Sequence, residues 1–292
     1  MTKKYIAISI LLISCCFSFS QENYGFIGVI AINDSISNSY KIELTQKSGV
    51  VKGFSVTDLG GEHETRSNIF GEYDKDKKEL SFRETGIVYT KSPVSQQDFC
   101  FINTTIKGFV FGKTKTIKSN FVGLFSDNTQ CINGKLFMNS IEKVENRIEK
   151  VTKKINNSNK IHDSLKQKIN LTKMMDSLNM NILRKNQTLS VFSKSATLKL
   201  IVYDGGKLDG DKISITLNDK PYLMNYEAKS DKKILTLNLN GLKTSIKIKA
   251  LNEGSIAPNT IVVELQDGNN TIKALSNLKA GETTRIDILK EN

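Results

Sequence analysis

Short apolar runs recur along residues 24–139, and turn-forming residues separate them. Many of the runs alternate apolar and polar positions, which is the period of a strand with one buried face. Segments such as Asn33-Asp34-Ser35 and Asn133-Gly134 are typical of turns between strands. The pattern predicts an antiparallel β-barrel or sandwich. The runs are Phe26–Ile32, Tyr40–Leu44, Val50–Val56, Leu80–Phe82, Ile87–Tyr89, Phe99–Ile102, Ile106–Phe111, Phe121–Phe125 and Cys131–Met138.

Residues 140–195 change to a helical period. Ile141, Val144, Ile148 and later apolar residues recur at spacings of three and four, and an asparagine-rich break precedes a second stripe that ends at Ile182. This periodicity is typical of coiled-coil-like helices. We expect helices over 141–155 and 161–183, with the stripes facing an apolar partner. That partner is either the other half of the segment or a second chain.

Residues 196–292 return to strands. Alternating apolar positions recur in Leu198–Val202, Ile213–Leu217, Leu235–Leu239 and Ile246–Ala250, and the connections are rich in Gly, Asp and Asn. Clean alternation places one face of each strand in the core and the other in water. The pattern predicts a C-terminal β-sandwich.

A family resemblance covers this last third of the chain. It is carried by Leu200–Asp204, Leu208–Asp211, Ile213–Asn218 and Ala250–Gly254. The segment resembles a β-sandwich domain found at the C-terminus of many exported bacterial proteins, which implies a fold and an attached module but no particular reaction. Residues 24–139 are loosely similar to small lipocalin-like meander barrels, without a shared motif.

The N-terminus has the order of a secretion signal. Lys3 and Lys4 precede an apolar stretch, and the small residues Ser18 and Ser20 precede the polar Gln21. This order predicts a signal peptide over residues 1–20. The alternative is a lipobox ending at Cys15, whose lipidation would anchor the protein to a membrane. We expect an exported protein, secreted or periplasmic, unless Cys15 is lipidated.

Charge is unevenly distributed. The chain has 42 basic and 30 acidic residues, a net +12, and residues 140–195 alone hold 12 basic and 5 acidic residues, or +7. A basic helix can contact phosphates, but no nucleic-acid-binding motif accompanies it. No nucleic-acid partner is expected. A solvated basic face is favoured, and contact with an anionic membrane or an acidic surface polymer is the alternative.

Two cysteines remain after cleavage of the signal, Cys100 and Cys131. An even pair in an exported protein predicts a disulfide, and two buried free thiols are the alternative. Closing a loop of this size stabilises a fold by about 3–4 kcal/mol.

Asp204, Asp209 and Asp211 form the best candidate metal site, with glycines between them. Carboxylates on a flexible loop are typical Ca²⁺ ligands. The alternative is a plain acidic turn, in which the side chains accept backbone hydrogen bonds and no cofactor is bound. Glu62, His63 and Glu64 form a second candidate, although neighbouring side chains diverge.

Signals of catalysis are weak. The chain has neither a G-x-S-x-G nucleophile elbow nor a phosphate-binding glycine loop. We therefore expect an envelope or secreted binding protein that is not an enzyme. Its unidentified partner is a surface polymer, an envelope protein or a second copy bound through the spacer. The alternatives are an exported hydrolase, or a small-ligand carrier that uses the barrel. The expected units are a signal peptide (1–20), an antiparallel β domain (21–139), a basic helical spacer (140–195) and a β-sandwich (196–292).

Overall fold

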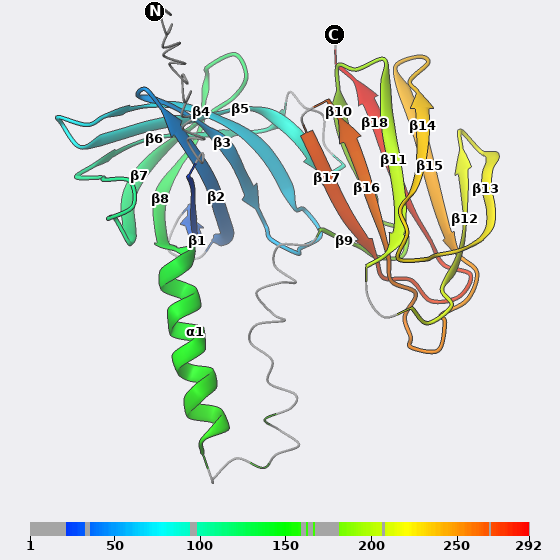
Figure 1. Ribbon diagram of the computed structural model, residues 1–292. Coiled ribbons are helices and arrows are strands. Elements are labelled where there is room, and N and C mark those ends of the chain that lie inside the picture. The colour runs from blue at the N-terminus through cyan, green and yellow to red at the C-terminus, as the bar shows by residue number, and fades with distance from the viewer. Residues whose placement is uncertain are drawn as a thin grey trace, which may run out of the picture.

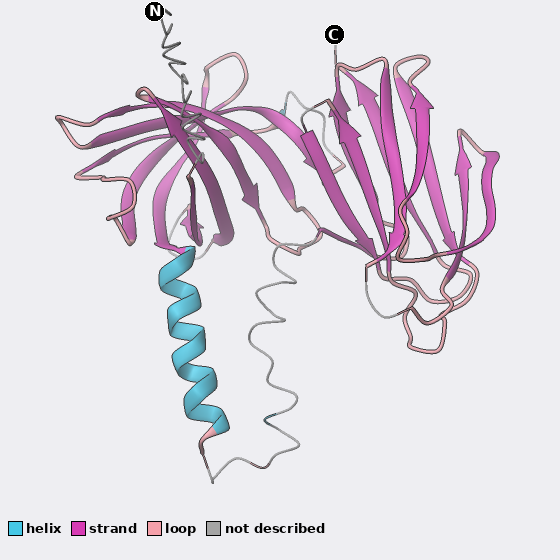
Figure 2. Cartoon of the chain, in the orientation of Figure 1, coloured by secondary structure: helices cyan, strands magenta, loops and turns pink. Residues whose placement is uncertain are grey.

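The computed structural model describes residues 22–32, 36–93, 98–158, 162, 166, 181–205, 208–268 and 270–291. These residues form strands β1 to β18 and helix α1. Figure 1 shows a barrel built from the N-terminal strands, a sandwich built from the C-terminal strands, and α1 projecting from one end of the barrel. Figure 2 shows how far strands predominate over helix, as the alternating sequence pattern predicts.

The first eight strands form a closed antiparallel barrel. Neighbours pair in the order β5-β4-β3-β2-β1-β8-β7-β6, and β6 pairs back onto β5 from Glu79↔Lys107 to Arg83↔Asn103. Closure gives each of these eight strands a hydrogen-bonded neighbour on both sides. The strands are β1 (Asn23–Ala31), β2 (Ser37–Lys47), β3 (Val50–Thr57), β4 (Thr65–Asp74), β5 (Glu79–Thr90), β6 (Phe101–Lys107), β7 (Thr116–Leu124) and β8 (Gln130–Ser140).

Buried apolar side chains fill the barrel. Alternate residues of the strands point inward, as the period of two requires. One end is packed with aromatic rings: Phe109 and Phe111 follow β6 and lie within 4.8–6.2 Å of Tyr24, Phe26 and Tyr73, measured between ring centroids. Of the run predicted as a strand over 106–111, only Ile106 and Lys107 belong to β6, and residues 108–111 form the turn that carries these two rings. The core comprises Phe26, Ile30, Tyr40, Ile42, Leu44, Val51, Ile69, Leu80, Phe82, Ile102, Ile106, Phe109, Ile117, Phe121, Leu136 and Met138.

β4 has no counterpart among the predicted strands. Its buried positions are Thr65, Ser67, Ile69 and Gly71, so most of its inward residues are small or polar. A Cβ added at Gly71 would lie 2.2 Å from the Ser81 carbonyl oxygen of the paired strand, so this position needs glycine. A strand with such an inner face lacks the apolar alternation on which the prediction relied.

The ten C-terminal strands lie in two layers of five. One runs β13-β12-β15-β18-β10 and the other β14-β11-β16-β17-β9, with an apolar core of residues from both. The C-terminal segment therefore packs as two facing layers. The strands are β9 (Asn181–Leu183), β10 (Thr188–Ser193), β11 (Thr197–Asp204), β12 (Lys212–Leu217), β13 (Lys220–Glu227), β14 (Lys233–Asn238), β15 (Lys243–Ala250), β16 (Ile261–Asp267), β17 (Asn270–Ser276) and β18 (Thr283–Lys290).

β10 joins the two units. It pairs in parallel with β18 of the sandwich, and Ser190 and Val191 also pair antiparallel with Thr90 and Tyr89 of the barrel strand β5. The barrel and one layer of the sandwich thus share a continuous 13-stranded sheet. β9 and β10 belong to the sandwich although they precede residue 196.

Helix α1 (Ile141–Asn156) begins where β8 ends. The Ser140 hydroxyl accepts a hydrogen bond from the Lys143 amide at 3.3 Å, which caps the first turn. The predicted helix over 141–155 is confirmed. No residue of α1 is buried, and Val151 is 46% exposed, so the expected apolar partner is not found within the described part of the chain.

The second predicted helix, over 161–183, is wrong at its C-terminal end. Asn181–Leu183 form β9, which pairs with β17 in the sandwich. Its other residues, apart from His162 and Lys166, lie outside the described residues. In the part of the chain that is described, no helix is long and apolar enough to cross a membrane.

Candidate functional site

The predicted disulfide is present. Cys100 and Cys131 are bonded, with their Cα atoms 6.0 Å apart and a separation of 31 positions in sequence. The bond crosses β7 at Gly123, where an added Cβ would lie 2.4 Å from the Cys100 sulfur. Glycine is therefore required beneath the bond, and this pair of cysteines is structural. Cys15, the alternative lipidation site, lies outside the described residues.

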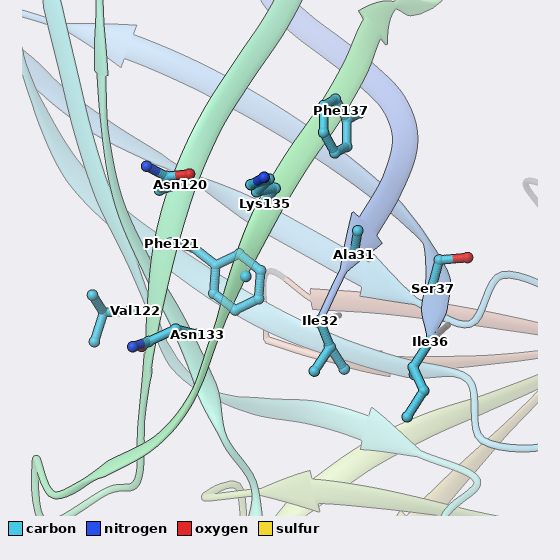
Figure 3. A pocket seen from close by; sticks show the side chains of 11 residues that line it. Ala31, Ile32, Ile36, Ser37, Asn120, Phe121, Val122, Asn133, Lys135 and Phe137 are labelled. Atoms are coloured by element: carbon cyan, nitrogen blue, oxygen red, sulfur yellow. The ribbon is translucent and has the colours of Figure 1, made fainter. Parts of the chain in front are cut away.

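A shallow hollow of about 730 Å³ lies on the outer wall of the barrel, where β1 ends beside β8 (Figure 3). Phe137 and Val122 line it and are 40% and 42% exposed. Asn120 and Lys135 supply polar groups from β7 and β8. None of the buried polar atoms that lack a hydrogen bond among the described residues lines this hollow.

A buried carboxylate lies inside the barrel wall. Glu84 is 4% exposed and accepts hydrogen bonds from the Tyr40 hydroxyl at 2.9 Å, the Ser55 hydroxyl at 2.5 Å and the Ile102 amide at 2.8 Å. Burial raises its pKa, and the three donors act in the opposite direction. Both carboxylate oxygens are occupied by donors of the barrel itself, which indicates a structural role.

A second buried carboxylate, Glu64, lies where the barrel meets the sandwich. It accepts hydrogen bonds from the Gly60 amide at 2.6 Å and the Tyr89 hydroxyl at 2.8 Å, and the Lys91 ammonium lies 3.6 Å away. Lys91 also donates to the Ile182 carbonyl of β9 at 3.0 Å, which ties the two units together. Burial lowers the pKa of Lys91, and the charge of Glu64 opposes that shift.

The candidate triplet around His63 does not converge. His63 is exposed and lies 3.3 Å from the Ser92 hydroxyl, whereas the side chain of Glu64 turns into the junction. The side chains of His63 and Glu64 therefore point in different directions, as expected for neighbouring residues. This loop does not bring the three groups to one point.

A cleft of about 630 Å³ opens between the barrel and the sandwich. Two pairs of opposite charge border it: Lys41 with Glu43 at 2.7 Å, and Glu264 with Lys273 at 3.9 Å. These pairs offset one another, so the cleft presents little net charge. The lining residues are Lys41, Glu43, Phe54, Val56, Leu59, Glu64, Arg66, Tyr89, Ile141, Asn181, Glu264, Thr271 and Lys273.

Two polar side chains of this cleft keep atoms without a hydrogen bond. Asn181 is 4% exposed, and neither its amide nitrogen nor its amide oxygen has a partner among the described residues. Arg66 lies 3.7 Å from the centre of the Phe54 ring and donates to the Thr271 carbonyl at 3.4 Å, yet its buried Nε has no acceptor in the described chain. Buried polar groups in folded proteins nearly always have partners, so these atoms make the cleft a candidate ligand site.

Sequence reasoning missed this cleft. Asn181 falls at the end of a stripe that was interpreted as helix, and Arg66 falls in β4, which was not predicted. The two residues come together because β10 joins the barrel to the sandwich. No local signal in the sequence indicates that contact.

The three predicted metal-loop residues lie at one end of the sandwich. Asp204 ends β11, and Asp209 and Asp211 lie in the connection to β12. Burial raises the pKa of Asp211 to about 6, and a hydrogen bond from the Thr260 amide opposes this shift. The negative charges of Asp209, Asp204 and Glu253 raise the pKa further. The loop therefore gathers like charges around a carboxylate that is 1% exposed.

Acidic, histidine and cysteine side chains do not complete a metal site by themselves in the described residues. Gly206 and Lys207 of the predicted loop lie outside those residues. Any ion bound at this end of the sandwich would need amide, backbone or water oxygens in addition to carboxylates.

Comparisons with known proteins give no relative. No family model, no curated protein and no solved structure matches the chain. The functional argument therefore rests on the geometry of the molecule.

Proposed function

We propose that this chain is an exported, non-catalytic binding protein that holds an uncharged, hydroxyl-rich ligand in the cleft between the barrel and the sandwich. The observation that carries the proposal is Asn181, whose amide is buried in the cleft wall with both polar atoms unpaired within the described structure. A sugar hydroxyl both donates and accepts hydrogen bonds, so vicinal hydroxyls can satisfy the two halves of an amide.

The balance of charge in the cleft favours a neutral ligand. Lys41 and Glu43 offset each other, as do Glu264 and Lys273. The unpaired Nε of Arg66 adds one donor, and Val56 and Leu59 add apolar surface for the carbon face of a sugar ring. A segment of a surface polysaccharide has this combination of chemistry, and it is one of the partners expected from the sequence.

The carboxylates near the cleft favour binding over hydrolysis. Glu64 is occupied by Gly60, Tyr89 and Lys91, and Glu264 accepts a hydrogen bond from Gln266 at 2.9 Å and lies 3.5 Å from Lys232. A glycosidase needs one carboxyl group free to donate a proton and one free to act as base or nucleophile. The filled interior of the barrel likewise favours a binding protein over a small-ligand carrier.

Export is part of the proposal. Its supports are the signal-like order of residues 1–20 and the Cys100–Cys131 bond, since disulfides persist mainly in oxidising compartments. Mass spectrometry of the protein purified from its own cells should find a chain that begins at Gln21. A lipidated chain that begins at Cys15 would contradict cleavage at this point.

The binding proposal is tested on an array of neutral and acidic bacterial surface polysaccharides, with the whole mature protein as the probe. We expect a neutral polysaccharide to bind, and calorimetry with that polysaccharide to give at least tenfold weaker affinity for Asn181→Leu. Asn120→Leu, in the hollow of the barrel wall, is the matched control and should bind as the wild type does. Binding lost in Asn120→Leu but kept in Asn181→Leu would move the site to the barrel wall. An array without any bound neutral polysaccharide would overturn the ligand class.

A further inference from the structure

We propose that the end of the sandwich binds one calcium ion, with the carboxylates of Asp209 and Asp211 and the side-chain oxygen of Asn259 as ligands. This site is separate from the proposed polysaccharide cleft. Asn259 lies in the loop before β16, 48 residues after Asp211, and is not part of the acidic run. The site therefore needs two loops of the sandwich.

Three buried oxygens carry the inference. Asp209 Oδ1, Asp211 Oδ1 and Asn259 Oδ1 are buried and have no hydrogen-bond donor among the described residues. Each is an acceptor, so they cannot satisfy one another. A buried acceptor without a donor costs about 1–3 kcal/mol, and a cation that prefers oxygen ligands would satisfy all three.

The orientation of Asn259 is fixed by its other amide atom. Asn259 is fully buried, and its Nδ2 donates to the carbonyl oxygens of Lys212 at 3.2 Å and Asn252 at 3.1 Å. Exchanging the amide nitrogen and oxygen would lose both hydrogen bonds, so the unpaired atom is the oxygen. Because Lys212 follows Asp211 directly, these hydrogen bonds hold Asn259 beside the acidic loop.

The two aspartates share one arrangement. Asp211 Oδ2 accepts from the Thr260 amide at 2.7 Å, and Asp209 Oδ2 accepts from the Ile256 amide at 3.1 Å. In each carboxylate, an amide of the opposite loop positions one oxygen and leaves the other without a donor in the described structure. This is the arrangement of a monodentate metal ligand whose orientation is set by a second hydrogen bond.

The opposite loop is shaped around Asp209. Gly254 has φ +58°, and a Cβ added there would lie 2.6 Å from the Asp209 carboxylate. The Ser255 amide donates to the Asp209 carbonyl at 2.9 Å, and Asn252 donates to the Gly210 carbonyl at 2.8 Å. The two loops are thus held together by their own hydrogen bonds, which leaves the unpaired oxygens in place for an ion.

The electrostatic balance also favours a cation. Asp204, Asp209 and Glu253 all repel a negative charge on Asp211. Lys212, the basic residue adjacent in sequence, forms a salt bridge with Glu227 at 3.4 Å. An all-oxygen set of carboxylate and amide ligands is typical of calcium, which completes its coordination with backbone carbonyls and water.

The test uses the whole mature protein. Its thermal unfolding is followed by calorimetry in EDTA, in millimolar CaCl₂ and in equal MgCl₂. At a calcium concentration 100 times the dissociation constant, we expect the melting temperature of the whole protein, unfolding as one unit, to rise by about 5–10 °C. Magnesium should give a much smaller rise, because it demands a rigid octahedral set of ligands.

Variants locate the ion. Asp211→Asn and Asn259→Leu should lose the calcium shift, and Asp231→Asn, at an exposed position of the same sandwich, should keep it. Direct titration of the wild type with calcium measures binding even if a variant fails to fold. A wild type that neither binds calcium nor melts later in it overturns the proposal, as does an equal shift with magnesium or a shift kept in folded Asp211→Asn. Asn181→Leu should keep the calcium shift, so failure of the polysaccharide proposal remains distinguishable.

Discussion

The barrel and the sandwich each bury a carboxylate with a raised pKa, but the two carboxylates differ in how many hydrogen bonds they accept. Glu84 in the barrel receives three hydrogen bonds, from Tyr40, Ser55 and Ile102. Asp211 in the sandwich receives one from Thr260, and its other oxygen has no donor in the described residues. Neighbouring acids add to the pKa shift of Asp211, whereas donors oppose that of Glu84.

This difference distinguishes a buried carboxylate with a structural role from one that is a candidate ligand-binding group. A buried carboxylate whose oxygens all have donors inside the fold needs no further partner. One that keeps an unpaired oxygen beside other acids destabilises the fold until a ligand is bound. Four changes test this distinction, from the largest expected effect to the smallest.

Loss of the disulfide should weaken the barrel most. The double variant Cys100→Ser and Cys131→Ser should lower the free energy of unfolding of the barrel by about 3–4 kcal/mol, because the unfolded chain is no longer constrained by the 31-residue loop. Urea unfolding measures the effect. Dithiothreitol should reproduce it in the wild type and change nothing in the double variant. An unchanged midpoint would contradict the structural role of the bond.

Replacing the satisfied carboxylate should come next. Glu84→Leu leaves the hydroxyls of Tyr40 and Ser55 and the amide of Ile102 without an acceptor, and we expect a loss of about 3 kcal/mol. Glu72→Leu, at an exposed position of β4, is the control and should change stability little. A Glu84 variant as stable as the control would remove the basis of the comparison.

The corresponding change in the sandwich should have the opposite sign. In EDTA, Asp211→Asn removes repulsion from Asp204, Asp209 and Glu253, and the new amide can donate to an unpaired acceptor. We expect the free energy of unfolding of the sandwich to rise by about 1 kcal/mol. Denaturant unfolding with chelator present measures it. A loss of stability would mean that the carboxylate of Asp211 is satisfied without an ion.

The junction should give the smallest effect. The pKa of Lys91 is lowered in the folded state by burial, against the charge of Glu64. The folded protein therefore binds this proton less tightly than the unfolded chain, and stability rises as pH increases from the lowered pKa toward 10.5. Lys91→Met should flatten this rise in the alkaline range below pH 10.5, and Lys77→Met, at an exposed turn, should not. Identical slopes in both variants would contradict the shift.

Much of the secondary structure could be predicted from local pattern. Alternation located most strands of the barrel and about half of those of the sandwich, and the stripe from Ile141 located α1, because period and burial are linked within a single strand or helix. β4 was missed because its inner face carries Thr65, Ser67 and Gly71. The segment Asn181–Leu183 was predicted as helix because Ile182 continues the helical spacing of the preceding stripe. Three residues are too few to distinguish the period of a helix from that of a strand.

The residues of the candidate sites also fall into two groups, those that the sequence indicates and those that only the folded structure indicates. The spacing of Asp204, Asp209 and Asp211 is visible in the sequence, and so is the pair Cys100 and Cys131, the two cysteines beyond the predicted signal peptide. Asn259 and Asn181 are not distinguished from other asparagines by any local signal. Each becomes notable through an unpaired atom, and that property exists only after distant segments have packed around it.

The sequence by itself determined the strand-rich character of the chain, the first helix and the disulfide. These features depend on residue type at short spacing, or on the two cysteines that lie beyond the predicted signal peptide. Only the tertiary structure decided that the barrel closes on itself, that β10 joins it to the sandwich, and that a polar cleft opens at the join. Closure and docking depend on contacts between residues far apart in sequence, and the side chains that make those contacts carry no periodic signal of their own.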